Sequence, residues 1–181
     1  MFLGNEKAQL IKPDESYYEA VASYQREMLV AKSSMEGMGV LKRLVDPAEW
    51  LRQSRSGEHP ELLPPGRVPV TQFILADPET KRIYGMLQVR HSLNEYMKRF
   101  AGHIGYSVRP TERGKGYATK MLNEALVFCK EELKLEKVMV SCRAENEASR
   151  RTILACGGVL DEKVYEFISD FWVEKYWITL E

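Results

Sequence analysis

The sequence predicts one α/β domain built around a mixed β-sheet. Apolar residues recur at helical spacing in about four segments, and short apolar runs bounded by turn residues occur in six or seven others. These segments follow the order strand, two helices, three strands, helix, strand, helix and two strands. No internal repeat or domain linker interrupts that order, so we expect residues 1–181 to fold as a single domain in which helices cover the sheet.

The first third of the chain predicts a strand followed by two helices. The run AQLIKP, residues 8–13, is typical of a short strand. Pro13 opens a helix that reaches about Lys32, because acidic residues occupy its first turn and apolar residues follow at helical spacing. A second helix begins at Asp46–Pro47, and the Pro- and Gly-rich residues 54–69 are expected to form a surface loop.

Strands and helices alternate through the rest of the chain. The runs at 70–77 and 82–91 flank the turn sequence PETK, so they predict a β-hairpin. The remaining elements are a strand over 102–109, a helix over 116–133, a buried strand over 137–142, a helix over 145–156, and a closing hairpin over 159–168 and 171–180. The core-facing stripe of the helix over 116–133 is predicted to be Ala118, Leu122, Ala125, Leu126, Cys129 and Leu133.

The charge balance disfavours nucleic acid and anionic membranes as partners. The 26 basic residues match the 26 acidic ones, so the chain has no net field that would attract a polyanion, and any affinity for an anion must be local. No apolar run reaches the 18 or so residues of a membrane span, and the N-terminus does not resemble a signal peptide. We therefore expect a cytoplasmic protein without a membrane partner.

The three cysteines favour reduced thiols over a metal site or a disulfide framework. Cys129, Cys142 and Cys156 form no CxxC pair, and no histidine stands at metal-ligand spacing from them. We expect no metal. A nucleophilic role for Cys142 is conceivable, but a small buried apolar residue is the favoured interpretation.

The stretch Arg113-Gly114-Lys115-Gly116 predicts an anion site at the start of a helix. Main-chain N–H groups at a helix N-terminus are unpaired and carry partial positive charge, and glycines allow an anion to approach them closely. Two nucleotide-binding motifs do not fit. A P-loop requires glycine where Arg109 stands and Ser or Thr where Gly116 stands. The Rossmann fingerprint requires glycine at Thr119.

Arg113 to Ala118 matches the pattern Arg/Gln-x-x-Gly-x-Gly/Ala, and in this the chain resembles the GNAT superfamily of acyl-CoA-dependent N-acyltransferases. A second segment carries the family's Asn-x-x-Ser/Ala followed by a helix that ends at glycine, here Asn146, Ser149 and Gly157. Spacing and element order agree over roughly Ile83 to Leu160. The resemblance implies a mostly antiparallel sheet of six or seven strands with about four helices, and it identifies the expected anion as the pyrophosphate of coenzyme A.

The resemblance also implies which residues contact acetyl-CoA. The main chain of Tyr106, Ser107 and Val108 would pair with the pantetheine arm, and Asn146 and Ser149 would lie near its far end. Asn146 has a competing interpretation as a helix N-cap. The residues implied to hold the pyrophosphate are Arg113, Gly114, Lys115, Gly116, Tyr117, Ala118 and Thr119.

For the chemistry, the resemblance implies direct attack of a primary amine on the acetyl thioester in a ternary complex. Many relatives donate a proton from a tyrosine seven residues after the helix-start asparagine, but here that position is Ile153. His103 is the candidate base, because its reference pKa of about 6.5 suits proton transfer near neutral pH. Tyr106 is the candidate donor. The competing interpretations are a strand histidine that faces solvent or a neighbouring strand, and a tyrosine of the core.

The acceptor cannot be identified from the residues. His91 and Asn94, in VRHSLN, either line the acceptor pocket or form a capped turn. The pattern is closest to the branch with ribosomal-protein and small-amine acetyltransferases, so a small-molecule or peptide amine is expected. The alternative function is a non-catalytic acyl-CoA sensor of the same fold. A third interpretation is an interaction protein that dimerises through its C-terminal strands, and a homodimer is compatible with either of the others.

Overall fold

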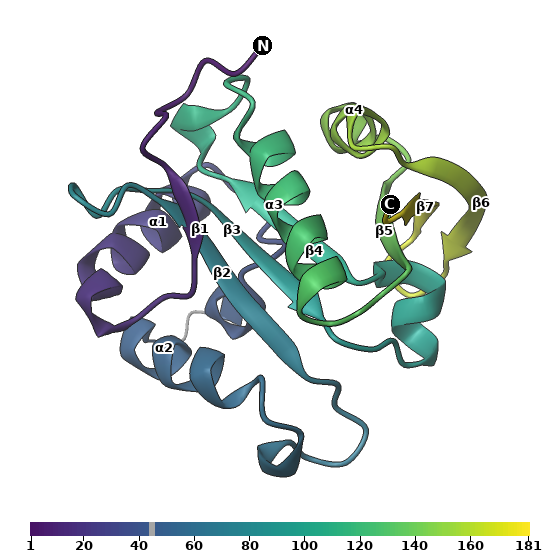
Figure 1. The fold of residues 1–181 in the computed structure, drawn as a ribbon, viewed down its shortest axis with the longest axis horizontal. Coiled ribbons are helices and arrows are strands. Elements are labelled where there is room, and N and C mark those ends of the chain that lie inside the picture. Colours follow the sequence, from purple (N-terminus) through teal and green to yellow (C-terminus); the bar gives the residue numbers. More distant parts are fainter. Residues whose placement is uncertain (44–45) are drawn as a thin grey trace.

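The structure is a computed structural model, and it describes residues 1–43 and 46–181 (Figure 1). The first elements are β1 (Gln9–Ile11), α1 (Tyr18–Val30), α2 (Pro47–Ser56), β2 (Val70–Ala76), β3 (Ile83–Arg90) and β4 (Ile104–Val108). They are followed by α3 (Tyr117–Glu131), β5 (Lys137–Arg143), α4 (Glu147–Ala155), β6 (Val159–Glu166) and β7 (Phe171–Thr179). This order confirms the predicted one.

All the strands belong to one sheet, in the spatial order β1-β2-β3-β4-β5-β7-β6. Neighbouring strands are antiparallel except β4 and β5, which run parallel. A parallel pair requires a crossover connection, and α3 supplies it. The predicted fold class, a mixed and mostly antiparallel sheet with about four helices, is therefore confirmed.

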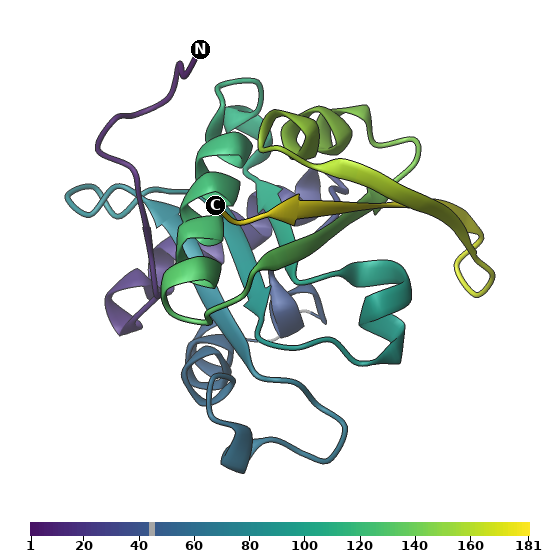
Figure 2. The ribbon, with the colours of Figure 1, turned by 45° about the vertical axis from the view of Figure 1, so that its right-hand side comes forward.

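Helices cover both faces of the sheet, with α1 and α2 on one side and α3 and α4 on the other (Figures 1 and 2). The alternation of β2 shows how one strand serves both faces, since successive side chains of a strand point to opposite sides. Phe73 and Leu75 lie in the cluster under α3, whereas Ile74 and Ala76 lie in the cluster under α1 and α2. Burial on both faces explains why β2 is almost continuously apolar.

Short polar side chains cap the turns that begin the helical segments, as the sequence leads us to expect. The side chain of Asp14 accepts a hydrogen bond from the main chain of Ser16, and that of Asp46 from Ala48. Asn146 Oδ1 accepts from Ser149 N at 3.1 Å and caps α4. The N-cap interpretation of Asn146 is therefore confirmed, because the bond satisfies an otherwise unpaired donor.

The structure differs from the predicted elements in three places. The predicted helix from Pro13 begins as a 3-10 turn at Glu15–Tyr17 before α1 starts at Tyr18. Most of the predicted core face of α3 is confirmed, since Leu122, Ala125, Leu126 and Cys129 are buried, but Ala118 is only half-buried, and Tyr117 and Met121 join that face. The connection after β3 was expected to be irregular, but it contains a turn of π-helix at Met97–Ala101.

The β6–β7 hairpin extends away from the rest of the sheet, and β6 forms its edge (Figure 2). Phe167 and Ile168 at the hairpin tip are 76% and 92% exposed. Within residues 1–43 and 46–181, no helix has the length and apolar character needed to cross a membrane.

Candidate functional site

A cleft opens where β4 and β5 separate. β4 pairs with β3 along its whole length, from Ile104 to Val108, but its only ladder pair with β5 is Ile104 with Val140. Beyond that pair the two parallel strands diverge, and a cavity of about 1070 Å³ lies between them. One edge of β4 is therefore left without a neighbouring strand inside the described parts of the chain. An extended ligand can hydrogen-bond along such an edge.

A glycine loop closes one end of this cleft. Gly114 has φ +78° and Gly116 has φ +91°, a backbone region that side chains other than glycine rarely adopt. Gly116 is the N-cap of α3 and makes no side-chain capping bond, so the main-chain N–H groups of the first turn keep their capacity to bind an anion. A Cβ atom built at Gly114 meets no atom within 4 Å, so the loop faces open space.

Of the expected coenzyme A contacts, all but Lys115 line the cleft. They are Tyr106, Ser107, Val108, Arg113, Gly114, Gly116, Tyr117, Ala118, Thr119, Asn146 and Ser149. The Lys115 ammonium instead pairs with Glu112 Oε2 at 2.8 Å. Glu112 also pairs with Arg82 at 2.6 Å. Burial raises the pKa of Glu112, but hydrogen bonds from Lys115 and Arg82 outweigh it and hold that pKa below its usual value.

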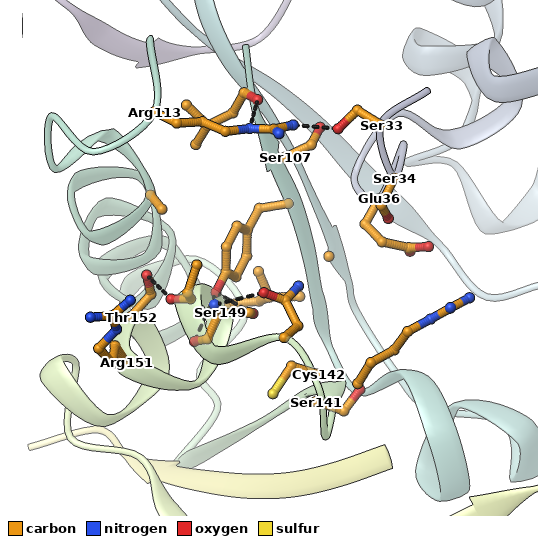
Figure 3. A pocket seen from close by; sticks show the side chains of 18 of the residues that line it. Ser33, Ser34, Glu36, Ser107, Arg113, Ser141, Cys142, Ser149, Arg151 and Thr152 are labelled. Carbon is orange, nitrogen blue, oxygen red and sulfur yellow. Dashed lines mark hydrogen bonds between the residues drawn. The ribbon is translucent and has the colours of Figure 1, made fainter. Parts of the chain in front are cut away.

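Arg113 connects the loop to the segment after α1. Its guanidinium donates to the hydroxyl of Ser33 and to the main-chain oxygen of Val108, the latter at 3.3 Å (Figure 3). A second arginine fixes the same corner, since the side chain of Arg109 pairs with Glu27 at 2.7 Å. These contacts hold the end of β4 and the loop in one position relative to α1.

The N-terminal segment also supports the loop, although the sequence did not indicate this. Leu3 N donates to Lys115 O at 3.0 Å. The ring of Phe2 packs edge-on against Tyr117 at 5.3 Å, and Tyr117 stacks on Tyr84 at 4.6 Å. The first turn of α3 is therefore fixed from both sides, which makes the glycine loop a rigid site.

Tyr106 and Ser149 meet in the cleft as a pair of hydroxyl groups. Tyr106 projects from β4 toward α4, and its hydroxyl oxygen lies 2.8 Å from Ser149 Oγ. Burial raises the pKa of Tyr106 to about 12, so its hydroxyl carries a proton at neutral pH. Tyr106 therefore combines core packing with a polar group that reaches the cleft.

Cys142, on β5, lies in the same part of the cleft. It is 7% exposed, and burial raises the pKa of its thiol to about 11. A thiol with this pKa is protonated at neutral pH and is a poor nucleophile. This agrees with the interpretation of Cys142 as a small buried residue. Ile153, at the family's tyrosine position, is completely buried.

His103 does not line the cleft. Its Nδ1 accepts a hydrogen bond from Met139 N at 2.9 Å, and its ring lies 6.3 Å from that of Trp177. Burial lowers the pKa of His103 to about 4. The structure therefore places the expected base against β5, in contact with a neighbouring strand, rather than beside a ligand.

His91 and Asn94 also lie away from the cleft lining. His91 Nε2 is 2.8 Å from Thr71 Oγ1, and its ring lies 6.5 Å from that of Phe128 on α3. Asn94 Oδ1 accepts from Met97 N at 3.0 Å and caps the π-helical turn. Asn94 matches the capped-turn interpretation of this segment, whereas His91 packs between β2 and α3.

The end of the cleft opposite the loop consists of residues that the sequence did not indicate. Ser34 and Glu36 come from the segment after α1, which starts beside the loop with Ser33, the partner of Arg113, and lies on the side of the cleft away from Ser149 and α4 (Figure 3). Other residues that line the cleft outside the loop are Arg90, Tyr96, Phe100, Ser141, Arg143 and Phe171. Their positions in the chain are far apart, so no local motif unites them.

Gly37 is the one sequence signal that could have located this end. It has φ +73°, and a Cβ atom built on it would lie 2.6 Å from the main-chain oxygen of Gly105. Only glycine permits so close an approach, and the approach seats the segment after α1 on β4. Glu36 is thereby brought to the cleft.

A family model described as an acetyltransferase (GNAT) domain matches residues 10–159. A comparison with curated protein sequences finds no match. Many solved structures share the fold. The ribosomal-protein-S5-alanine acetyltransferase of Vibrio fischeri is 17% identical with a TM-score of 0.73, and the match covers 98% of this chain and 96% of that one.

Two other structures show the same likeness. The microcin C7 self-immunity acetyltransferase MccE, solved with acetyl-CoA and AMP, is 17% identical with a TM-score of 0.71, and the match covers 97% of this chain and 93% of that one. A spermidine N-acetyltransferase SpeG variant from Vibrio cholerae is 15% identical with a TM-score of 0.64, and the match covers 95% of each chain. At these identities the three structures establish the fold.

Proposed function

The chain belongs to the GNAT acetyltransferase family, whose members use acetyl-CoA, and on that premise we propose that it transfers an acetyl group to a primary amine, as a single domain over residues 1–181. The observation that carries the proposal is the unpaired edge of β4 beside the glycine loop. That edge suits an extended pantetheine arm, and the loop at its end suits a pyrophosphate.

The residues of the cleft fit acetyl-CoA. The main chain of Tyr106, Ser107 and Val108 would pair with the pantetheine, and Asn146 and Ser149 would lie beside it. The pyrophosphate would be held by the main chain from Arg113 to Ala118 and by the Thr119 hydroxyl. Acetyl-CoA supplies the activated acetyl thioester. Because Glu112 already balances the charge of Lys115, we assign the pyrophosphate contacts mainly to main-chain N–H groups.

Glu36 is the base that the geometry favours. An amine must lose its proton before it can attack, since a free lysine-type ammonium has a pKa of about 10.4. Of the two described carboxylates that line the cleft, Glu112 is already paired with Arg82 and Lys115, whereas Glu36 is exposed at the opposite end. Glu36 can accept the proton directly or through a water molecule. His103 is the weaker candidate, because its ring is buried against Met139 and Trp177.

Tyr106 is the proton donor for the departing sulfur. Its raised pKa keeps the hydroxyl protonated, and its bond to Ser149 orients it toward the cleft. Between turnovers the hydroxyl of Ser149 can relay a proton from solvent to Tyr106, taking one up as it passes one on. With Ile153 buried at the usual tyrosine position, a donor from β4 supports catalysis in this chain.

Calorimetric titration with acetyl-CoA, followed by a thiol-release assay with a panel of amines, tests the proposal. Binding together with amine-dependent release of CoA is the expected result. Binding without release from any amine would favour the alternative, a non-catalytic acyl-CoA sensor. A folded protein that binds neither acetyl-CoA nor CoA would overturn both.

A further inference from the structure

Arg90 lines the cleft beside Glu36, and among the described residues its guanidinium forms no ion pair. It ends β3, and its main chain is fixed in the sheet by a 2.7 Å bond from Arg90 N to His103 O. Its Nη1 donates to the main-chain oxygen of Gly102 at 3.0 Å and, weakly, to that of Ala101 at 3.4 Å. Within residues 1–43 and 46–181 no carboxylate oxygen lies within 4 Å of its nitrogens.

Arg109 provides a comparison, because its guanidinium lies outside the cleft lining and is paired within the protein. Arg109 is 4% exposed, and it pairs with Glu27 at 2.7 Å and donates to Ile83 O at 2.7 Å. A buried charge costs free energy unless it is paired. Burial lowers the pKa of Arg90, and the nearby carboxylate of Glu36 opposes this effect only in part. The half-buried guanidinium of Arg90, which forms no ion pair with a described residue, thus differs from the buried and paired one of Arg109.

The guanidinium of Arg90 lies against the middle of β4, beside the cleft. A Cβ atom built at Gly105 would lie 3.5 Å from Arg90 Nη2, so the guanidinium covers Gly105 on the face of β4 that carries Gly37. Tyr106, the next residue, points to the opposite face. The guanidinium therefore lies one residue from the proposed proton donor and across the strand from it.

The charged side chains in this part of the cleft are complementary to a ligand that carries one positive and one negative group. Glu36 and Arg90 both line the cleft, and Glu36 lies close enough to influence the titration of Arg90. Arg143 adds a second cation, although the ring of Phe171 and Glu145, 3.8 Å away, already contact it. One carboxylate suits the ammonium group of an acceptor, and an unpaired arginine suits an anion on the same molecule.

We propose that the acceptor is a primary amine that also carries an anionic group, a carboxylate or a phosphate, and that Arg90 binds this anion while Glu36 receives the amine. The proposal rests on the proposed function, because it names the substrate class of the same cleft. It distinguishes this chain from an enzyme for polycations, which the charge of Arg90 would repel.

Arginine-detected NMR of the protein saturated with CoA tests the anion site without requiring turnover. The Nε resonance of Arg90 is assigned from its absence in Arg90→Lys. β-Alanine is titrated beside 3-aminopropanamide, and phosphoethanolamine beside ethanolamine, so that each pair differs only in the anion and the two pairs separate carboxylate from phosphate. Spermidine serves as the polycation.

A saturable shift of the Arg90 resonance with one anionic amine, and none with its neutral partner, is expected. The proposal is overturned if no anionic amine shifts the resonance, or if neutral amines and spermidine shift it equally. The titration is repeated without CoA, and CoA binding is measured separately by calorimetry. Failure of the proposed function would thus appear as absent CoA binding, whatever Arg90 does.

Kinetics provide the second readout. In a thiol-release assay, we expect Arg90→Gln to reduce the preference for the anionic over the neutral amine by about tenfold or more, the scale of a lost charge-assisted bond. Arg99→Gln is the matched control, because Arg99 is exposed on the neighbouring π-helical turn and outside the cleft lining. An unchanged preference in Arg90→Gln, or an equal loss in Arg99→Gln, would contradict the assignment.

Discussion

The two ends of the cleft are built from the chain in different ways. The loop end comes almost entirely from one continuous stretch, Tyr106 to Thr119, so its lining residues are close together in the sequence. The opposite end is assembled from the segment after α1, the end of β3, the π-helical turn, and the ends of β5 and β7. A continuous site leaves a motif in the sequence, whereas a site gathered by folding leaves none.

Blocking the loop end should have the largest effect. In Gly114→Val the side chain would enter space that no protein atom occupies, at a φ of +78° that valine tolerates poorly. We expect acetyl-CoA affinity to fall about a thousandfold, or ~4 kcal/mol, measured by calorimetry. Gly66→Val is the matched control, since Gly66 has φ +81° and equally open surroundings but lies in the loop after α2. Similar loss in both variants would mean that backbone strain, not the site, is responsible.

Removing the base at the opposite end should have the next largest effect. We expect Glu36→Gln to lower kcat/KM about a hundredfold, the usual contribution of a general base, while acetyl-CoA binding stays intact. Glu58→Gln provides the comparison, because Glu58 pairs with Lys12 at 2.7 Å outside the cleft. If calorimetry showed acetyl-CoA affinity falling with kcat/KM in Glu36→Gln, the two ends would not be functionally separate.

The hydroxyl of Tyr106 should have a smaller effect, on kcat alone. Tyr106→Phe removes the bond to Ser149 and, with it, the proposed proton donor, so we expect a loss of about tenfold in kcat. Tyr176 is also buried, burial raises its pKa to about 12 as well, and it donates to Glu174 at 2.7 Å outside the cleft lining. Steady-state kinetics of Tyr176→Phe should show an unchanged kcat. A normal kcat in Tyr106→Phe would remove Tyr106 from the mechanism.

His103 should matter for stability and little for catalysis. Its pKa is about 4 when folded against about 6.5 when unfolded, so the unfolded chain binds more protons between these values and the free energy of unfolding decreases as pH falls from 6.5 to 4. The decrease due to His103 is at most roughly 3 kcal/mol. Urea unfolding of His103→Asn should show a weaker dependence across this range. An acetylation rate reduced a hundredfold in that variant would restore His103 as the base.

The order and type of the elements were predictable because their signals are local. Periodicity, capping residues and turn residues lie within each segment, as at Asp46, where the expected helix begins, and at Asn146, which caps α4. In the first turn of α3 the core residue is Tyr117 and not the predicted Ala118, because Tyr117 is amphipathic: its ring packs into the core while its hydroxyl accepts from Asn5 N at 2.7 Å. The helical spacing of apolar residues alone cannot assign such a residue to the buried or the exposed face.

The loop end of the site was predictable for the same reason, and the acceptor end was not. Glu36 and Arg90 are 54 positions apart in the sequence, and only the seating of Gly37 on β4 and the end of β3 brings them to one cleft. His91 and His103 were attractive because of their chemistry. Nothing in the sequence showed that the side chain of His91 contacts Thr71 or that His103 Nδ1 serves the main chain of Met139.

The single ladder pair between β4 and β5 has a mechanical consequence. It divides the sheet into a four-stranded plate and a three-stranded plate that share one hinge, at Ile104 and Val140. Beyond the hinge, β4 and β5 make no ladder hydrogen bonds to each other. An extended ligand bound between them could supply such bonds and would then connect the two parts of the sheet. The two parts of the sheet should therefore move more freely without ligand than with it. Amide hydrogen exchange in β4 and in β5 should slow together when the ligand binds.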